Sequence, residues 1–190
     1  MRKKTFFILI AALLLTLSAC GGPQTTPPEP EEDKMLTVEE ILATTPAADL
    51  TCGAYDLVKY TRPYRSSQII YNETAIFVTD ENGSIPKATL MYPPARVLEV
   101  RNAALDVKYV EGTDYVVEAD GRISLPAGSA VYVTPYDEYY VTAAQEPNAD
   151  YRFPSASHAG RYLKYAEADY FYSKQICVTY IRTAAYTGPK

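Results

Sequence analysis

From Gln68 to Thr183 the chain is a succession of short apolar runs separated by turn residues, and this spacing most constrains its fold. Strands of all-β sandwiches and barrels recur at such intervals, with Gly, Pro, Asn and Asp between them. The pair Asp120-Gly121 gives the best hairpin signal, because Asp-Gly tolerates the positive φ angles of a type I′ turn. The pattern predicts an all-β domain, specifically a β-sandwich of the jelly-roll or immunoglobulin-like type.

The last expected strand is the clearest. Both of its alternating sets of side chains are largely apolar from Ile176 to Ile181, which predicts a central position in the sheet. The expected strands, in chain order, are 75–78, 88–92, 96–101, 106–110, 115–119, 122–125, 130–134, 139–143, 161–166, 170–172 and 175–183.

A short helix is expected before the strands. Thr37 and Glu40 have the spacing of the N-cap and N3 residues of a capping box, which predicts a helix from about Val38 to Ala43. Residues 37–63 are therefore assigned to this helix and a connecting segment, and residues 64–190 to the sandwich. Residues 20–36 are dominated by Pro, Gly and acids and predict a disordered tether.

Residues 1–19 have the layout of a secretory signal. Arg2, Lys3 and Lys4 precede an apolar run from Thr5 to Leu17, and Ser18-Ala19-Cys20 follows. The segment resembles a bacterial lipoprotein signal with a lipobox. That resemblance implies cleavage before Cys20, lipidation of its thiol, and an extracytoplasmic protein anchored by lipid to the cell membrane or envelope. An ordinary signal peptide or a short membrane anchor is the alternative, although the run is shorter than the ~20 residues of a spanning helix.

The charge balance narrows the classes of partner. Removing residues 1–19 takes away three cations and no acid, which leaves 15 Lys plus Arg against 23 Asp plus Glu and a net charge of −8. An acidic surface repels phosphate backbones, so nucleic acid is not expected as a partner. The same balance argues against a polybasic membrane signal, and the lipid is expected to supply the anchoring.

If Cys20 carries lipid, Cys52 and Cys177 remain. Exported proteins meet oxidising conditions, so a disulfide between these two residues is permitted. A small apolar Cys177 within a strand and an unrelated Cys52 are the alternative. The sequence has no CxxC motif and no Cys/His cluster, and we expect neither a metal site nor a cofactor.

Tyrosine is unusually frequent, with 18 Tyr against 5 Phe and no Trp. Tyrosine favours strands, and it also supplies flat, amphipathic contact area for ligands. Residues 132–140 (YVTPYDEYY) combine such rings with acids. With Tyr151 and Arg152 they would form a platform on which rings stack on a sugar and carboxylates hold its hydroxyls. The alternative is that these tyrosines pack along the rim of the sandwich. The candidate ligand-binding residues are Tyr136, Tyr139, Tyr140, Tyr151 and Arg152.

Four segments carry a resemblance to a known family: residues 91–94 (MYPP), 97–102 (VLEVRN), 109–126 (YVEGTDYVVEADGRISLP) and 174–180 (KQICVTY). Together they resemble the N-terminal β-rich domain that precedes the catalytic domain of some secreted bacterial SGNH/GDSL-type hydrolases. The resemblance implies an accessory β-sandwich. The sequence contains neither the Gly-Asp-Ser nucleophile block nor the Asp-x-x-His of that family, so no catalytic residue is carried over and no enzymatic activity is expected.

Other chemistry-bearing residues have simpler interpretations. Ser155, Ser157 and His158 contain the residue types of a catalytic Ser–His pair. Such a pair needs a base that reaches the nucleophile and a third group that orients the base. Adjacent loop residues rarely point at each other in this way, so a solvated histidine is expected. Residues 80–83 (DENG) are expected to form a turn. A calcium-binding loop is the alternative, but no full calcium-loop motif is present. Surface charge is expected for the remaining acids, Asp137-Glu138 and those at 111, 114, 118 and 120.

These observations predict a non-catalytic cell-surface lipoprotein whose β-domain binds an extracellular ligand. A glycan is the favoured ligand class, and a cell-surface protein is the next candidate. The alternative is an accessory domain or subunit of a separately encoded SGNH/GDSL-type esterase.

Overall fold

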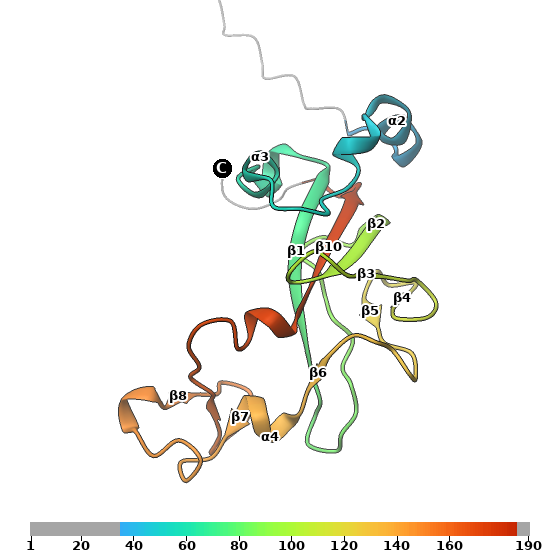
Figure 1. Cartoon of the computed structure of the whole chain (residues 1–190). Coiled ribbons are helices and arrows are strands. Elements are labelled where there is room, and N and C mark those ends of the chain that lie inside the picture. Colours follow the sequence, from blue (N-terminus) through green and yellow to red (C-terminus); the bar gives the residue numbers. More distant parts are fainter. Residues whose placement is uncertain (1–34, 186–190) are drawn as a thin grey trace, which may run out of the picture. The chain divides into compact units, whose positions relative to one another are not determined.

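The computed structural model describes residues 35–185, so the predicted signal segment, Cys20 and the predicted tether before Met35 lie outside the described residues. The described chain is mostly strands in curled, mixed sheets (Figure 1). A five-stranded sheet has the order β3-β2-β10-β1-β6. Its strands are β1 (Ile69–Val78), β2 (Pro94–Asn102), β3 (Lys108–Tyr109), β6 (Val133–Thr134) and β10 (Gln175–Arg182).

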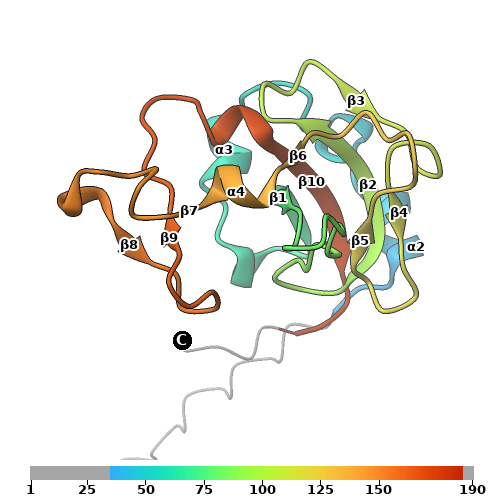
Figure 2. The ribbon, with the colours of Figure 1, turned by 90° about the horizontal axis from the view of Figure 1, so that it is seen from below.

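Two smaller sheets and several short helices complete the domain. Strands β4 (Val116–Val117) and β5 (Ile123–Ser124) form a hairpin, and β7 (Tyr140–Val141), β9 (Tyr162–Leu163) and β8 (Phe153–Pro154) form a three-stranded sheet in that order. The two small sheets lie apart from each other on either side of the main sheet (Figure 2). The helices are α2 (Val38–Thr44), α3 (Leu57–Tyr60) and α4 (Tyr136–Tyr139), with 3-10 turns η1 (Ala47–Asp49), η2 (Tyr64–Ser66), η3 (Ala149–Tyr151) and η4 (Tyr172–Lys174).

Strand β10 lies at the centre of the main sheet, as its two apolar faces predict. It pairs antiparallel with β1 and β2, whereas β1 pairs parallel with β6 through Phe77 and Val133. Its two faces serve two cores. Val178 and Tyr180 belong to a large core under the β4–β5 hairpin, and Ile181 belongs to a smaller core covered by the N-terminal segment. That smaller core contains Ile41, Cys52, Ile69, Tyr71 and Ile181.

A β-bulge in β1 sets which side chains enter each core. Ile70 pairs with Tyr180 and Glu73 pairs with Val178, so between these two pairs β1 contains one residue more than β10. Asn72, at φ +49°, lies within this step. The extra residue shifts the alternation of the strand. Ile70 and Phe77, which are an odd number of positions apart, therefore join the same large core.

The predicted helix is confirmed. The backbone N–H of Glu40 donates to Thr37 Oγ1 at 3.2 Å, and the backbone N–H of Thr37 donates to Glu40 Oε2 at 2.8 Å, so both halves of the capping box are formed. The helix extends one residue further than expected, to Thr44, and it buries Ile41. Within residues 35–185 no helix is both long enough and apolar enough to cross a membrane.

The predicted hairpin is confirmed, but the predicted turn type is wrong. The backbone N–H of Gly121 donates to the carbonyl of Glu118 at 2.9 Å, and that of Glu118 donates to the carbonyl of Arg122 at 2.8 Å. The loop therefore has three residues, and only Gly121 has a positive φ, of 79°. A type I′ turn needs two such residues, whereas a type I turn followed by one left-handed glycine needs a single one.

Several expected strands differ from the observed structure. Residues 88–92 make only an isolated bridge from Ala88 to Ile123. The backbone N–H groups of Met91 and Tyr92 donate to side chains, Glu73 Oε1 at 2.6 Å and the Tyr180 hydroxyl at 3.3 Å, and not to a neighbouring strand. Residues 170–172 form a turn and the start of η4, after the left-handed residue Ala168 at φ +56°. Six further strands are present but reduced to two residues, namely those expected at 106–110, 115–119, 122–125, 130–134, 139–143 and 161–166.

Candidate functional site

The predicted ligand-binding residues lie in and beside the three-stranded sheet: Tyr140 is in β7, Tyr136 and Tyr139 are in α4, and Tyr151 and Arg152 are at η3. The chain leaves the main sheet after β6, passes through α4 into β7, and returns through η4 into β10. Tyr140 and Phe153 both lie directly opposite Leu163 across the strand pairs, so these three side chains share one face.

Tyr136, Tyr139 and Tyr140 form a packed cluster. The ring centroids of Tyr136 and Tyr140 are 5.0 Å apart, and those of Tyr139 and Tyr140 are 4.9 Å apart. Tyr136 is only 7% exposed, and its hydroxyl donates to Glu81 Oε1 at 2.8 Å. Tyr139 also packs edge-on against Phe171 at 5.3 Å. These contacts favour packing over ligand binding for Tyr136, which lies in a helical turn.

Tyr151 packs with a second group of rings. Its ring stacks on that of Tyr165 with centroids 4.4 Å apart and planes 17° apart, and Phe153 lies 6.4 Å from Tyr165. Together with Leu163 these residues are 36 to 50% exposed. We call Tyr151, Phe153, Leu163 and Tyr165 the aromatic patch. Sequence reasoning identified only Tyr151 of the four. The density of aromatic residues between 151 and 172 was the available signal for the others.

Arg152 orders the loop beside the aromatic patch. Its Nε donates to the carbonyl of Glu146 at 2.7 Å, and its Nη2 donates to the carbonyls of Ala143 and Pro147, each at 3.1 Å. The guanidinium also lies 6.0 Å from the centroid of the Tyr162 ring. Because these acceptors all belong to residues 143–147, Arg152 acts here as a positioning residue for that loop.

Glu138 in α4 ties the three-stranded sheet to β10. Its Oε1 accepts hydrogen bonds from the hydroxyl of Tyr170 and from Nζ of Lys174, the residue just before β10. The ammonium of Lys174 lies 3.6 Å from the centroid of the Tyr170 ring and 5.4 Å from that of Tyr132. Hydrogen bonds from Lys174 and then Tyr170 lower the pKa of Glu138. We call Tyr132, Glu138, Tyr170 and Lys174 the latch.

Replacing Glu138 by glutamine is expected to loosen the three-stranded sheet locally. Glutamine is neutral, so the hydrogen bonds from Tyr170 and Lys174 would lose their charge assistance, which corresponds to about 1–3 kcal/mol. Native-state hydrogen exchange should show faster exchange of the amides in β7 and β9, with β10 unchanged. The neighbouring Asp137→Asn is the control, since the Asp137 side chain is 71% exposed in its ion pair with Arg161 and such pairs contribute little. Equal effects of both variants would contradict the latch.

His158 differs from the expected solvated residue. Its ring lies 4.0 Å from that of Tyr140 and 5.4 Å from that of Tyr136, centroid to centroid. The hydroxyls of Ser157 and Ser155 lie 2.8 Å and 3.3 Å from Nδ1, so these loop residues do point at each other. Within residues 35–185 no carboxylate hydrogen-bonds to the imidazole, so the orienting group of a triad is missing from the described chain.

The acids expected to carry surface charge, and Asp80 in the predicted turn, are mostly engaged with cations or backbone amides. Glu118 pairs with Lys87 at 3.0 Å and Asp120 pairs with Arg122 at 2.7 Å. Asp80 closes the predicted turn, because its Oδ1 accepts from the backbone N–H groups of Asn82 and Ser84, each at 2.8 Å. In the described part of the chain no group of three or more His, Cys, Asp or Glu residues is arranged to hold a metal ion.

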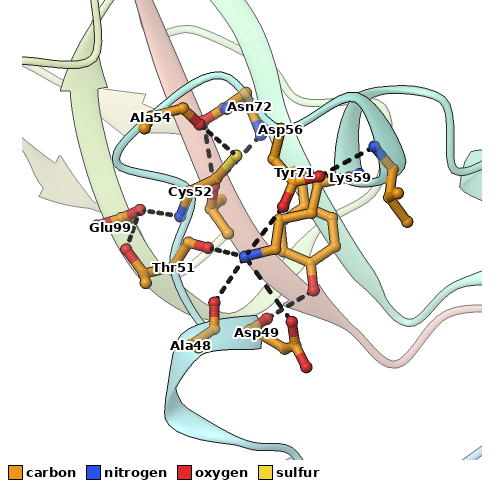
Figure 3. Close-up of polar contacts among 12 residues, drawn as sticks. Ala48, Asp49, Thr51, Cys52, Ala54, Asp56, Lys59, Tyr71, Asn72 and Glu99 are labelled. Carbon is orange, nitrogen blue, oxygen red and sulfur yellow. Dashed lines mark hydrogen bonds and ion pairs between the residues drawn. The ribbon is translucent and has the colours of Figure 1, made fainter.

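A second polar cluster, built around Glu99 of β2, holds the N-terminal segment against the main sheet (Figure 3). Glu99 is 3% exposed, and its Oε1 accepts from the backbone N–H of Cys52 at 2.6 Å and from Thr51 Oγ1 at 2.7 Å. Its Oε2 accepts from Arg101 Nε at 3.0 Å. Burial raises the pKa of Glu99, but the hydrogen bonds from Cys52, Thr51 and Arg101 outweigh burial, so the pKa lies below its ordinary value.

Lys59 of α3 makes the other half of this attachment. Its Nζ donates to the carbonyls of Ala48 at 2.6 Å and Thr51 at 2.8 Å, and lies 3.9 Å from Asp49 and 4.0 Å from Asp56 (Figure 3). Only 11% of the Lys59 side chain is exposed. The ammonium therefore binds the loop that precedes α3, which makes it a structural group.

Cys52 and Cys177 are both buried and both free thiols. Burial raises the pKa of Cys177 to about 11, with a smaller contribution from Cys52, and burial also raises the pKa of Cys52. Such thiols are poor nucleophiles, because the thiolate is the reactive form. The disulfide between them remains a prediction.

Comparison of the chain with protein-family models, with curated proteins and with solved structures found no match.

Proposed function

We propose that this protein is a non-catalytic, lipid-anchored protein of the bacterial cell surface whose β-rich domain binds an extracellular glycan. The observation that carries the ligand class is the aromatic patch. Three exposed rings and one leucine lie together on a small sheet, and large apolar side chains grouped on a surface mark binding sites.

The chemistry of the aromatic patch suits a sugar. Aromatic rings offer flat apolar faces with polar rims, and a pyranose ring offers an apolar face edged by hydroxyls. Beside the rings, Glu167 accepts a hydrogen bond from the hydroxyl of Tyr165 at 3.2 Å and is itself exposed. Its carboxylate is an acceptor for a sugar hydroxyl at the edge of the patch.

The sandwich type of fold is part of the same proposal. Ile123 of the β4–β5 hairpin is fully buried in the large core with Val100 and Val178 of the main sheet. This contact supports a second layer over one face of the main sheet, as in a sandwich. The extracytoplasmic address and the lipid on Cys20 are supported by the resemblance of residues 1–20 to a lipobox signal.

The glycan proposal predicts that two single substitutions in the aromatic patch weaken binding. A chain of residues 35–190 suits the measurement, because both cores and all three sheets lie within residues 35–185. Tyr165→Ala and Phe153→Ala should each raise the Kd for a bound cell-wall polymer about tenfold, which corresponds to about 1.4 kcal/mol. Calorimetric titration against purified cell-wall polymers and a glycan panel would measure this.

Tyr55→Ala is the matched control, since this tyrosine is 71% exposed and precedes α3, outside both the aromatic patch and the latch. Equal loss in the control, or binding that persists in both patch variants, would remove the patch from the proposal. A panel without any saturable binder would overturn the glycan assignment and favour a protein partner, beginning with a separately encoded SGNH/GDSL-type esterase.

A further inference from the structure

In helix α3 the charged side chain is turned inward and the aliphatic side chains are exposed, which is the reverse of an ordinary surface helix. Lys59, its charged residue, is turned inward and clamped to backbone carbonyls, with its side chain 11% exposed. Leu57 and Val58, its aliphatic residues, are 60% and 69% exposed. A surface turn normally places charge outward and aliphatic side chains inward. The contacts of Lys59 therefore hold the aliphatic pair in solvent.

Two tyrosines extend this exposed surface. Tyr55 precedes the helix and Tyr60 ends it, both are exposed, and their ring centroids are 5.1 Å apart. We call Tyr55, Leu57, Val58 and Tyr60 the α3 patch. Isolated exposed apolar residues need no explanation, but four within six consecutive residues form a contiguous surface that marks an interaction site.

The α3 patch is held rigidly. Asp56 caps the helix, because its Oδ1 accepts from the backbone N–H groups of Val58 at 2.9 Å and Lys59 at 3.2 Å. The hydroxyl of Tyr71 in β1 donates to the carbonyl of Asp49, in the loop that Lys59 clamps, at 2.6 Å. The patch is thus presented by a fixed turn, and little conformational entropy is lost when it is buried.

The α3 patch lies at the end of the domain where the described chain begins. The backbone N–H of Leu36 donates to Gln68 Oε1 at 2.8 Å, and Gln68 Nε2 donates to the carbonyl of Leu36 at 2.9 Å, just before β1. Helices α2 and α3 lie at this end of β1 (Figure 1). The opposite end of β1 pairs with β6, from which the chain continues to the three-stranded sheet and its aromatic patch.

We propose that the α3 patch inserts into the interface of the membrane that holds the lipid, and so orients the domain with its aromatic patch away from the bilayer. This inference rests on the proposed lipidation of Cys20. Only the 14 residues from Gly21 to Lys34 separate that cysteine from the domain, a reach of roughly 40 Å. Such a short tether keeps the patch at a high effective concentration near the bilayer.

The chemistry of the α3 patch favours a bilayer over a protein as its partner. Tyrosines accumulate at membrane–water interfaces, because the ring lies among the acyl chains and the hydroxyl among the headgroups. Charge does not drive this contact. Removing residues 1–34 removes four cations and four acids, which leaves residues 35–190 with a net charge of −5. Docking should therefore occur on zwitterionic lipid and be insensitive to salt.

The chain contains no tryptophan, so one introduced tryptophan reports on a single site. The mature chain, residues 20–190, is coupled through the Cys20 thiol to a maleimide lipid in phosphatidylcholine vesicles, while the buried Cys52 and Cys177 stay unreacted. Val58→Trp should then show a blue shift and quenching by lipids brominated on their acyl chains. Val110→Trp is the matched control, because Val110 is 57% exposed outside the α3 patch, and it should show neither effect.

Adding Leu57→Asp to the Val58→Trp chain should abolish both effects. Emission from Val58→Trp that matches Val110→Trp on the vesicles would overturn membrane docking. A shift that appears only when envelope proteins are added would overturn it in favour of a protein partner. Chemical coupling makes the result independent of lipidation in the cell. Mass spectrometry of the Cys20 peptide from the host envelope tests that lipidation separately, and the glycan titration tests the aromatic patch.

Discussion

Replacing Glu99 by alanine is expected to lower the free energy of unfolding by about 3–5 kcal/mol, the range for breaking a buried ion pair by removing one partner. The substitution leaves the guanidinium of Arg101, the hydroxyl of Thr51 and the backbone N–H of Cys52 without their common acceptor. Urea unfolding of residues 35–190 would measure the loss. Glu111→Ala is the control, since Glu111 is exposed and such substitutions change stability by about 0.5 kcal/mol or less.

The acid dependence of stability gives an independent readout of the same carboxylate. Because the pKa of Glu99 is lower in the folded chain than its ordinary value of about 4.3, the ionised carboxylate stabilises the fold fully above that value. This contribution is lost as the pH falls through the folded pKa. The difference in stability between the natural chain and Glu99→Gln should therefore shrink in acid. A difference that stays constant from neutral to acidic pH would contradict the role of the charge.

Replacing Ile181 by alanine is expected to cost about 2–5 kcal/mol, because the side chain is fully buried and the surroundings close only partly around the cavity. Ile181 lies on the face of β10 that packs against Ile41 and Cys52 of the N-terminal segment. The variant should therefore react faster at Cys52 with a thiol reagent, in addition to unfolding at lower urea concentration. Thiol labelling followed by peptide mass mapping would measure this.

The control for this substitution is Val110→Ala, which removes an exposed aliphatic side chain. It should change neither stability nor thiol labelling appreciably. If Ile181→Ala lowered stability while Cys52 stayed protected, the smaller core would not be what holds the N-terminal segment. That result would mean that the contacts of Glu99 and Lys59 alone hold the N-terminal segment against the main sheet.

Features that depend on neighbours in the chain were predictable from the sequence. The capping box joins Thr37 and Glu40, three positions apart, and the helix begins where these residues place it. The central position of β10 follows from its own composition, because a strand with two apolar faces must be covered on both. Asp120-Gly121 predicted the β4–β5 hairpin. It did not predict that the loop has three residues and that only its glycine is left-handed.

The candidate sites depended on contacts between distant segments. The bulge at Asn72 exists because β1 must match the register of β10, more than a hundred residues away. Residues Tyr136–Tyr139 form a helical turn that is held by two distant residues. The backbone N–H of Tyr136 donates to Thr79 Oγ1 at 2.8 Å, and the Tyr136 hydroxyl donates to Glu81 Oε1. Tyr151 stacks on Tyr165 only because β8 pairs with β9.

The sequence by itself thus determined the mostly β character of the domain, the helix before it and the acidic balance. Each of these depends on composition or on residues within one turn of each other. Tertiary structure alone decided that the predicted tyrosines divide between a packed cluster and the aromatic patch, and that Lys59 turns inward while Leu57 and Val58 turn outward. The free energy of these arrangements comes from partners far apart in the chain, which local pattern does not encode.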